Sequence, residues 1–199
     1  MSTKKPLTWF VITYLIFQLI VILMRNDEQV FWHIMTGLML FASVSYLFYE
    51  RSIESKRIPT SVGVGIAASF AIVIVHTLIS YIIKDVHYFH ILKTLVTVGV
   101  YYKWQLIITM VVTIPLHELY MRTMLQQRLM EHTSKWAAVL ITSLASALLF
   151  VWTLNLELVL FIFVIQCILA VSYAYTKRLI TPMIGQILAI IILILIHAR

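Results

Sequence analysis

Long apolar segments alternate with short polar segments along the 199-residue chain. The apolar windows lie at about 7–24, 30–49, 61–83, 104–121, 136–154, 156–176 and 179–197. Each is close to the ~20 apolar residues that an α-helix needs to cross a bilayer. We therefore predict an all-α fold, a polytopic transmembrane helical bundle of seven spans.

The stretch 86–102 is shorter and richer in aromatic residues than these windows, and it contains Lys93. This composition is typical of a helix that lies in the membrane interface. A short eighth spanning helix is the alternative, and we favour the interfacial helix. Because the chain has no internal repeat and no long linker, we predict one integral membrane domain over residues 1–199.

Composition supports a membrane location. Hydrophobic residues make up 62% of the chain and charged residues 12%, whereas about 25% of the residues of an average soluble domain are charged. A transmembrane β-barrel is excluded because its strands alternate apolar and polar residues, while segments such as 136–154 are apolar on every side. We expect the lipid bilayer itself to be the main partner of the chain.

The net charge of +7 is carried by short segments between the apolar windows. Because the cations follow no single helix face, we predict no nucleic-acid partner. The excess of Lys and Arg in cytoplasmic loops instead predicts a multi-pass protein of the cell membrane with a cytoplasmic N-terminus and an external C-terminus. On this orientation the cytoplasmic cations are Lys4, Lys5, Arg51, Lys56, Arg57, Arg128, Lys135, Lys177 and Arg178.

One acidic residue, Glu118, lies within an apolar window, near its predicted cytoplasmic end. An ionisable side chain inside a span is costly and is a candidate functional residue. Arg122 follows four residues later, so the two side chains share one helical face and can form an ion pair. Pro115 precedes them and predicts a kink or a freed carbonyl. The pair either packs the bundle or belongs to a site.

His117 precedes Glu118, and His-Glu on a helix is similar to the start of the zinc-protease signature H-E-x-x-H. Met121 occupies the position of the second histidine, and a thioether is a poor zinc ligand. We therefore predict no metal site and no cofactor. His76, in the middle of window 61–83, is either a packing residue or a possible lining residue of a central cavity. A small transporter is a weaker alternative, because no pair of related broken helices is present.

The residues around Glu118 resemble the first motif of a known family. These are the CPBP intramembrane metalloproteases, also called the CAAX prenyl protease 2 or Abi family, which includes lysostaphin-resistance protein A-like and bacteriocin-immunity proteins. The family motif is E-E-x-x-x-R after a proline. Here the segment from Pro115 to Arg122 keeps the second glutamate as Glu118 and the arginine, while His117 replaces the first glutamate. The resemblance covers about residues 104–192, the CPBP/Abi-like core.

Two further family motifs are F-x-x-x-H and H-x-x-x-N. The second motif would begin at Phe150, which places Leu154 at the histidine position. In the third region Gln186 takes the histidine position and Ile190 the asparagine position. The resemblance implies that the lost side chains are those that activate water and hold the oxyanion. Leucine and isoleucine can do neither, and glutamine is not a base at neutral pH.

The resemblance therefore implies a degenerate member of the family, with the family fold and without proteolysis by the family mechanism. Such a bacterial pseudoprotease would bind a membrane protein or peptide partner and act as an immunity, scaffold or regulatory protein for membrane or cell-envelope partners. The alternative is an active intramembrane endopeptidase with an altered site around His117 and Glu118.

Overall fold

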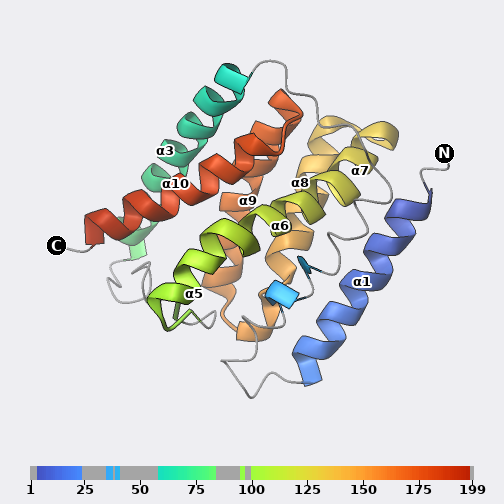
Figure 1. Ribbon diagram of the computed structural model, residues 1–199, viewed down its shortest axis with the longest axis horizontal. Coiled ribbons are helices and arrows are strands. Elements are labelled where there is room, and N and C mark those ends of the chain that lie inside the picture. Colours follow the sequence, from blue (N-terminus) through green and yellow to red (C-terminus); the bar gives the residue numbers. More distant parts are fainter. Residues whose placement is uncertain are drawn as a thin grey trace.

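The structure is a computed structural model, and it describes residues 4–23, 35–37, 39–40, 58–83, 95–96 and 100–197. These residues form helices and no strand, so the predicted all-α fold is confirmed for them (Figure 1). The elements are α1 (Lys4–Leu23), α3 (Ile58–Ile83), α5 (Lys103–Ile108), η1 (Thr109–Thr113), α6 (Ile114–Leu119), η2 (Tyr120–Gln126), α7 (Gln127–His132), α8 (Lys135–Leu148), η3 (Val151–Thr153), α9 (Leu156–Thr176) and α10 (Ile180–His197).

Four helices in the described part of the chain are long and apolar enough to cross a membrane. They cover Pro6–Leu23, Ile58–Tyr81, Lys103–His132 and Leu156–Thr176, and two shorter apolar helices cover Lys135–Leu148 and Ile180–Ile196. Six of the predicted windows therefore correspond to apolar helices of a membrane bundle. Most of the window 30–49 and most of the helix predicted at 86–102 lie outside the described residues.

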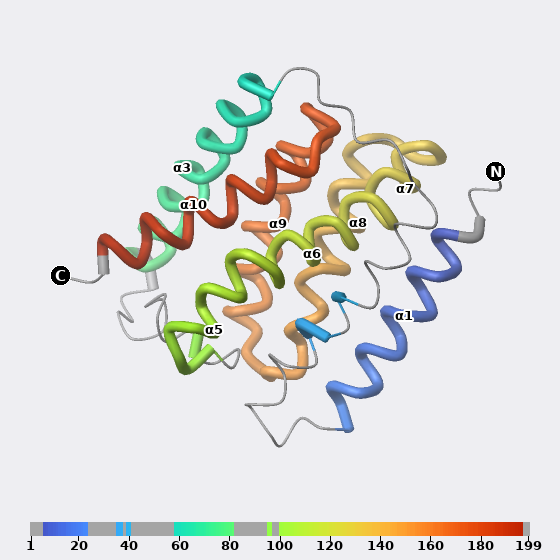
Figure 2. The backbone as a smooth tube through the Cα atoms, viewed as in Figure 1, coloured from blue at the N-terminus to red at the C-terminus, as the bar shows by residue number. Residues whose placement is uncertain are grey.

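The predicted span 104–121 is too short, because helical backbone continues without a break from Lys103 to His132 as α5, η1, α6, η2 and α7 (Figure 2). The apolar window ends at residue 121 because polar residues such as Arg122 and Gln126 follow, and their hydropathy predicts a position in water. Both are completely buried in the bundle. Glu118 therefore lies in the middle of a long helix, rather than near its end as predicted.

The long central helix contains two π-helical segments, η1 and η2, on either side of α6. In η1 the N–H of Ile114 donates to the carbonyl of Thr109, five residues earlier. Pro115 follows directly and has no N–H to donate to the preceding turn. Such wide turns are frequent at functional sites, and here they flank the six residues of α6, which include His117 and Glu118.

Short connections make the last helices antiparallel neighbours. Ser134 begins α8 by accepting a hydrogen bond from the Ala137 N–H at 3.2 Å, and Asn155 begins α9 in the same way with Leu158 at 3.1 Å. Lys177 ends α9 in the left-handed region, with φ of 53°. These caps satisfy backbone groups that a helix end leaves without partners.

Two close packing contacts position the helices around the centre. The first joins α1 to η2, where the Tyr120 hydroxyl lies 2.8 Å from Thr13 Oγ1 and donates to the Phe10 carbonyl at 3.0 Å. The second joins α3 to α10, which lie side by side in Figure 1. A Cβ atom at Gly65 would lie 2.9 Å from the Thr181 carbonyl oxygen, so this approach requires glycine.

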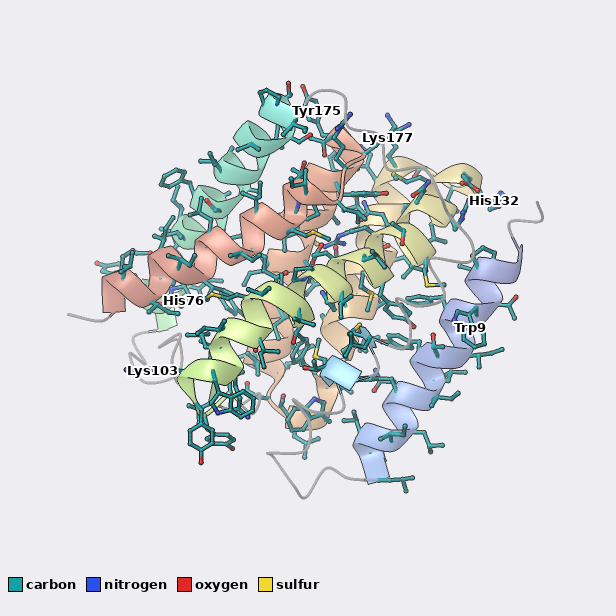
Figure 3. The ribbon with its side chains drawn as sticks, in the orientation of Figure 1. Trp9, His76, Lys103, His132, Tyr175 and Lys177 are labelled. Carbon is teal, nitrogen blue, oxygen red and sulfur yellow. The ribbon has the colours of Figure 1, made fainter. Side chains whose placement is uncertain are left out.

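Charged residues lie toward opposite ends of the bundle. Figure 3 shows His132 and Lys177 at the end where α1 begins, and Lys103 toward the other end. Between these ends, large apolar side chains such as Leu15, Ile74 and Leu195 are exposed on the outer surface. An apolar outer surface between polar ends is the pattern expected of a protein surrounded by lipid.

Candidate functional site

Glu118 and Arg122 form an ion pair on one face of the central helix. The Arg122 Nε donates to Glu118 Oε2 at 2.8 Å, and both side chains are completely buried. The pairing predicted from their four-residue spacing is therefore present. In hydrocarbon, such a pair avoids the large cost of burying either charge alone.

Arg122 also joins the central helix to α9. Its Nη2 donates to Gln166 Oε1 at 2.6 Å, and its Nη1 donates to Gln126 Oε1 at 3.2 Å. Gln126 in turn donates to the Ala170 carbonyl at 2.8 Å. The arginine thus has one partner on an adjacent span and two on its own helix, so it holds the bundle together as well as neutralising Glu118.

His117 lies between Glu118 and α8. Its Nδ1 is 3.4 Å from Glu118 Oε1, a charge contact longer than a good hydrogen bond. Its Nε2 forms a 2.9 Å hydrogen bond with Ser146 Oγ. In the tautomer that carries its proton on Nδ1, beside the carboxylate, Nε2 accepts a hydrogen bond from the serine hydroxyl. Both ring nitrogens therefore already have partners within the protein.

A cavity of about 170 Å³ lies beside His117. His117, Phe150, Gln186 and Ile190 all line it, so four positions from the three motifs meet at one place although they are far apart in sequence. The remaining lining residues are mostly apolar: Met35, Ile72, Leu95, Val100, Thr109, Thr113, Ile114, Phe161, Ile162, Ile165, Gln166, Ala189 and Leu193.

Glu118 and Arg122 do not line this cavity. Besides each other, they contact His117, Gln126 and Gln166, and neither side chain has any exposed surface. Water or a ligand in the cavity would therefore meet His117 before it met the carboxylate. The pair contacts the cavity through His117 and Gln166, two lining residues that Glu118 and Arg122 hold in place.

Two predicted positions lie outside the cavity. Leu154 is 78% exposed, and its φ of 53° places it in the left-handed region at the end of η3. A turn after Phe150 thus directs this position away from its motif partners. His76 is buried and its ring lies edge-on to Phe161, with centroids 5.5 Å apart. Phe161 lines the cavity, so His76 packs behind one of its lining residues, and a role for His76 in the cavity stays a prediction.

Metal binding was tested because the family resemblance is to metalloproteases. Among the described residues, no three His, Cys, Asp or Glu side chains lie close enough together to hold a metal ion. Of the residues that line the cavity, His117 is the one with a strong metal donor, and its ring nitrogens are engaged. The residues present in the described cavity do not fit a metal ion.

Three residues around the ion pair and His117 were not predicted from the sequence: Ser146, Gln126 and Gln166. Gln126 continues the four-residue spacing of Glu118 and Arg122, so the helical pattern contained a signal for it. Gln166 is a polar residue in the middle of window 156–176, where an amide requires a partner. Ser146 had no such signal, because serine is common at helix contacts in membranes.

Residues 99–192 match the family model of type II CAAX prenyl endopeptidase Rce1-like proteins. No curated protein and no solved structure matches the chain. The matched range begins just before α5 and ends within α10, so it contains all of the residues that line the cavity except Met35, Ile72, Leu95 and Leu193.

Proposed function

We propose that this chain, whose residues 99–192 match the model of the Rce1-like family of type II CAAX prenyl endopeptidases, is a member of that family that binds membrane peptides without cutting them. It is a multi-pass membrane protein, and its cavity lies between spanning helices. In this proposal the protein keeps the place where a peptide would bind and lacks the groups that would cleave it.

The state of His117 is the observation that carries this proposal. A general base needs a free lone pair that can reach the attacking water. His117 Nε2 is hydrogen-bonded to Ser146 Oγ at 2.9 Å and Nδ1 lies 3.4 Å from Glu118 Oε1, so both ring nitrogens face groups of the protein itself. Glu118 itself is paired with Arg122 behind the cavity wall. Gln186 and Ile190, which complete the lining at the motif positions, have no basic group.

Binding without cleavage requires only shape and a few polar groups. The cavity offers both, because apolar side chains surround His117, Gln166 and Gln186. A large apolar side chain of a membrane peptide is the natural occupant of such a cavity inside a membrane. A protein of this kind suits a role as an immunity, scaffold or regulatory protein, and we propose bacterial membrane or cell-envelope proteins as its partners.

We further propose that the protein lies in the cell membrane with its N-terminus in the cytoplasm. The end of the bundle where α1 begins also carries His132 and Lys177 (Figure 3). At this end Lys135 is the first residue of α8, and Lys177 and Arg178 lie in the α9–α10 connection. The positive-inside rule assigns such an end to the cytoplasm.

An active endopeptidase with an altered site is the second candidate. One observation favours it: His117 lines the cavity and lies within hydrogen-bond distance of a hydroxyl group. If a substrate displaced Ser146, the Nε2 lone pair would become available to a water molecule. This candidate predicts that His117→Ala abolishes cleavage while the protein stays folded.

A proteolysis assay in lipid vesicles separates the two candidates. Purified wild type, Glu118→Ala and a His117→Glu/Gln186→His/Ile190→Asn variant would be incubated with a mixed set of apolar peptides. Leu154→His is the matched control, because this residue lies outside the cavity. Our proposal expects no cleavage by wild type or by the control. Cleavage by wild type that disappears in Glu118→Ala would make the protein a working protease.

A further inference from the structure

The polar groups that line the cavity differ in whether they have partners. Thr109 Oγ1 donates to the Gln105 carbonyl at 2.7 Å, and Thr113 Oγ1 lies 3.0 Å from Thr36 Oγ1. The two threonines are therefore satisfied within the protein. The nitrogens of His117 are engaged, as described above, and Gln166 Oε1 accepts from Arg122.

Gln186 is different from these residues. Its Oε1 is buried and has no hydrogen-bond partner among the described residues, although the side chain lines the cavity. A buried carbonyl oxygen without a donor loses its interaction with water and gains nothing in return. Such atoms are few in folded proteins and call for an explanation. At this position the simplest explanation is a donor that arrives with a ligand.

The amide of Gln186 can reach such a donor. The last side-chain torsion of glutamine is broad and roughly two-fold, so turning the oxygen toward the cavity costs little. Among the described residues no acidic side chain lines the cavity. A ligand with a cationic donor would therefore be buried there without a counter-charge, which is costly. The donor is therefore a neutral N–H or O–H group.

The size of the cavity limits the rest of the ligand. Its volume is about 170 Å³, and an apolar cavity of roughly 150 Å³ in another protein binds benzene. One large apolar side chain fits this space, whereas a whole helix does not. The peptide N–H beside such a side chain is free only at the first turn of a helix or in an extended segment.

We propose that Gln186 recognises a free backbone N–H of the bound membrane peptide through its side-chain oxygen, while the cavity takes the neighbouring apolar side chain. This inference rests on the proposed function, since it specifies what the cavity binds. Gln186 would then distinguish a peptide that has a free backbone N–H from the surrounding helices, whose N–H groups are already hydrogen-bonded.

Two small probes test the inference without a known partner. N-(4-fluorobenzyl)acetamide has an aromatic ring and one amide N–H, and its N-methyl derivative lacks that donor. Their binding to the full chain in lipid nanodiscs would be measured by fluorine NMR at equal concentrations in the membrane. We expect the N–H probe to bind wild type about tenfold more tightly, as one buried hydrogen bond predicts.

Three variants separate the sources of binding. Gln186→Met keeps the length of the side chain and removes the acceptor, and it should abolish the difference between the probes. Gln127→Met is the matched control, because Gln127 pairs with Tyr173 at 3.2 Å and does not line the cavity; it should keep the difference. Ile190→Trp fills the cavity and should abolish binding of both probes.

The possible failures are distinct. Equal binding of the two probes to wild type, lost in Ile190→Trp, would overturn the role of Gln186 and leave the cavity as a binding site. A preference for the N-methyl probe would also overturn it. If neither probe bound wild type, both the inference and the proposed binding function would be wrong. The comparison of the two probes on wild type needs no variant to fold.

Discussion

Removing the positive charge of the buried ion pair is the most informative perturbation of this bundle. Arg122→Met deletes three hydrogen bonds, at 2.8, 3.2 and 2.6 Å. It leaves the Glu118 carboxylate buried without the positive charge that Arg122 supplied. Breaking a buried pair in this way costs about 3–5 kcal/mol. We expect the free energy of unfolding to fall by that amount.

A second substitution should recover part of this loss. In Glu118→Gln/Arg122→Met no charge remains in the pair. The loss of unfolding free energy that remains comes from the amide oxygens of Gln126 and Gln166, which no longer accept from the Arg122 guanidinium. That cost is common to both variants, so the difference between them reports the uncompensated carboxylate alone. The double variant should therefore be more stable than Arg122→Met by roughly 2 kcal/mol, although it contains one more change.

Unfolding in mixed micelles with increasing SDS, followed by far-UV circular dichroism, measures these differences. Glu131→Gln is the matched control, because the Arg128–Glu131 pair at 3.0 Å is partly exposed, with Glu131 at 36%. This control should cost less than about 1 kcal/mol. If the double variant were as unstable as Arg122→Met, the cost would come from lost packing, and the electrostatic reasoning would be refuted.

Three smaller predictions follow from helix contacts and backbone geometry, each measured as a change in the free energy of unfolding by the same titration. Gly65→Ala should destabilise the bundle by about 1–3 kcal/mol because its Cβ would meet the Thr181 carbonyl. At Gly63 a new Cβ would meet nothing within 4 Å, so Gly63→Ala should stabilise the bundle by up to about 1 kcal/mol. Equal effects of the two substitutions would refute the close approach of α3 to α10. Ser134→Ala should cost about 1 kcal/mol through the lost α8 cap, and an unchanged value would contradict this role. Leu154→Gly should stabilise by about 1 kcal/mol, since φ is 53° there; a loss of stability would show that the leucine side chain contributes more than the strain.

The fold could be predicted largely from the sequence, because a lipid-facing helix must be apolar along its whole length. The window 156–176 coincides with α9. The method failed where polar residues are satisfied inside the bundle. Arg122 and Gln126 ended the window at 121, yet both are buried against α9, so the helix continues to His132.

The candidate site could be predicted in part. Spacing within one helix predicts the Glu118–Arg122 pair, because positions four apart always share a face. Distances between helices carry no such rule. The sequence did not indicate that Ser146 holds His117 Nε2, nor that a left-handed residue directs position 154 out of the cavity. These features depend on how the helices pack and turn.

The central claim is that the cavity holds a membrane peptide and leaves it whole. Placing photo-leucine at position 190, in the cavity lining, and irradiating the protein in vesicles with apolar peptides would test this claim most directly. Mass spectrometry of the cross-linked products reads both binding and cleavage. Our account predicts intact peptides joined at position 190. Peptide fragments cut at one bond, absent when His117 is replaced by alanine, would contradict it.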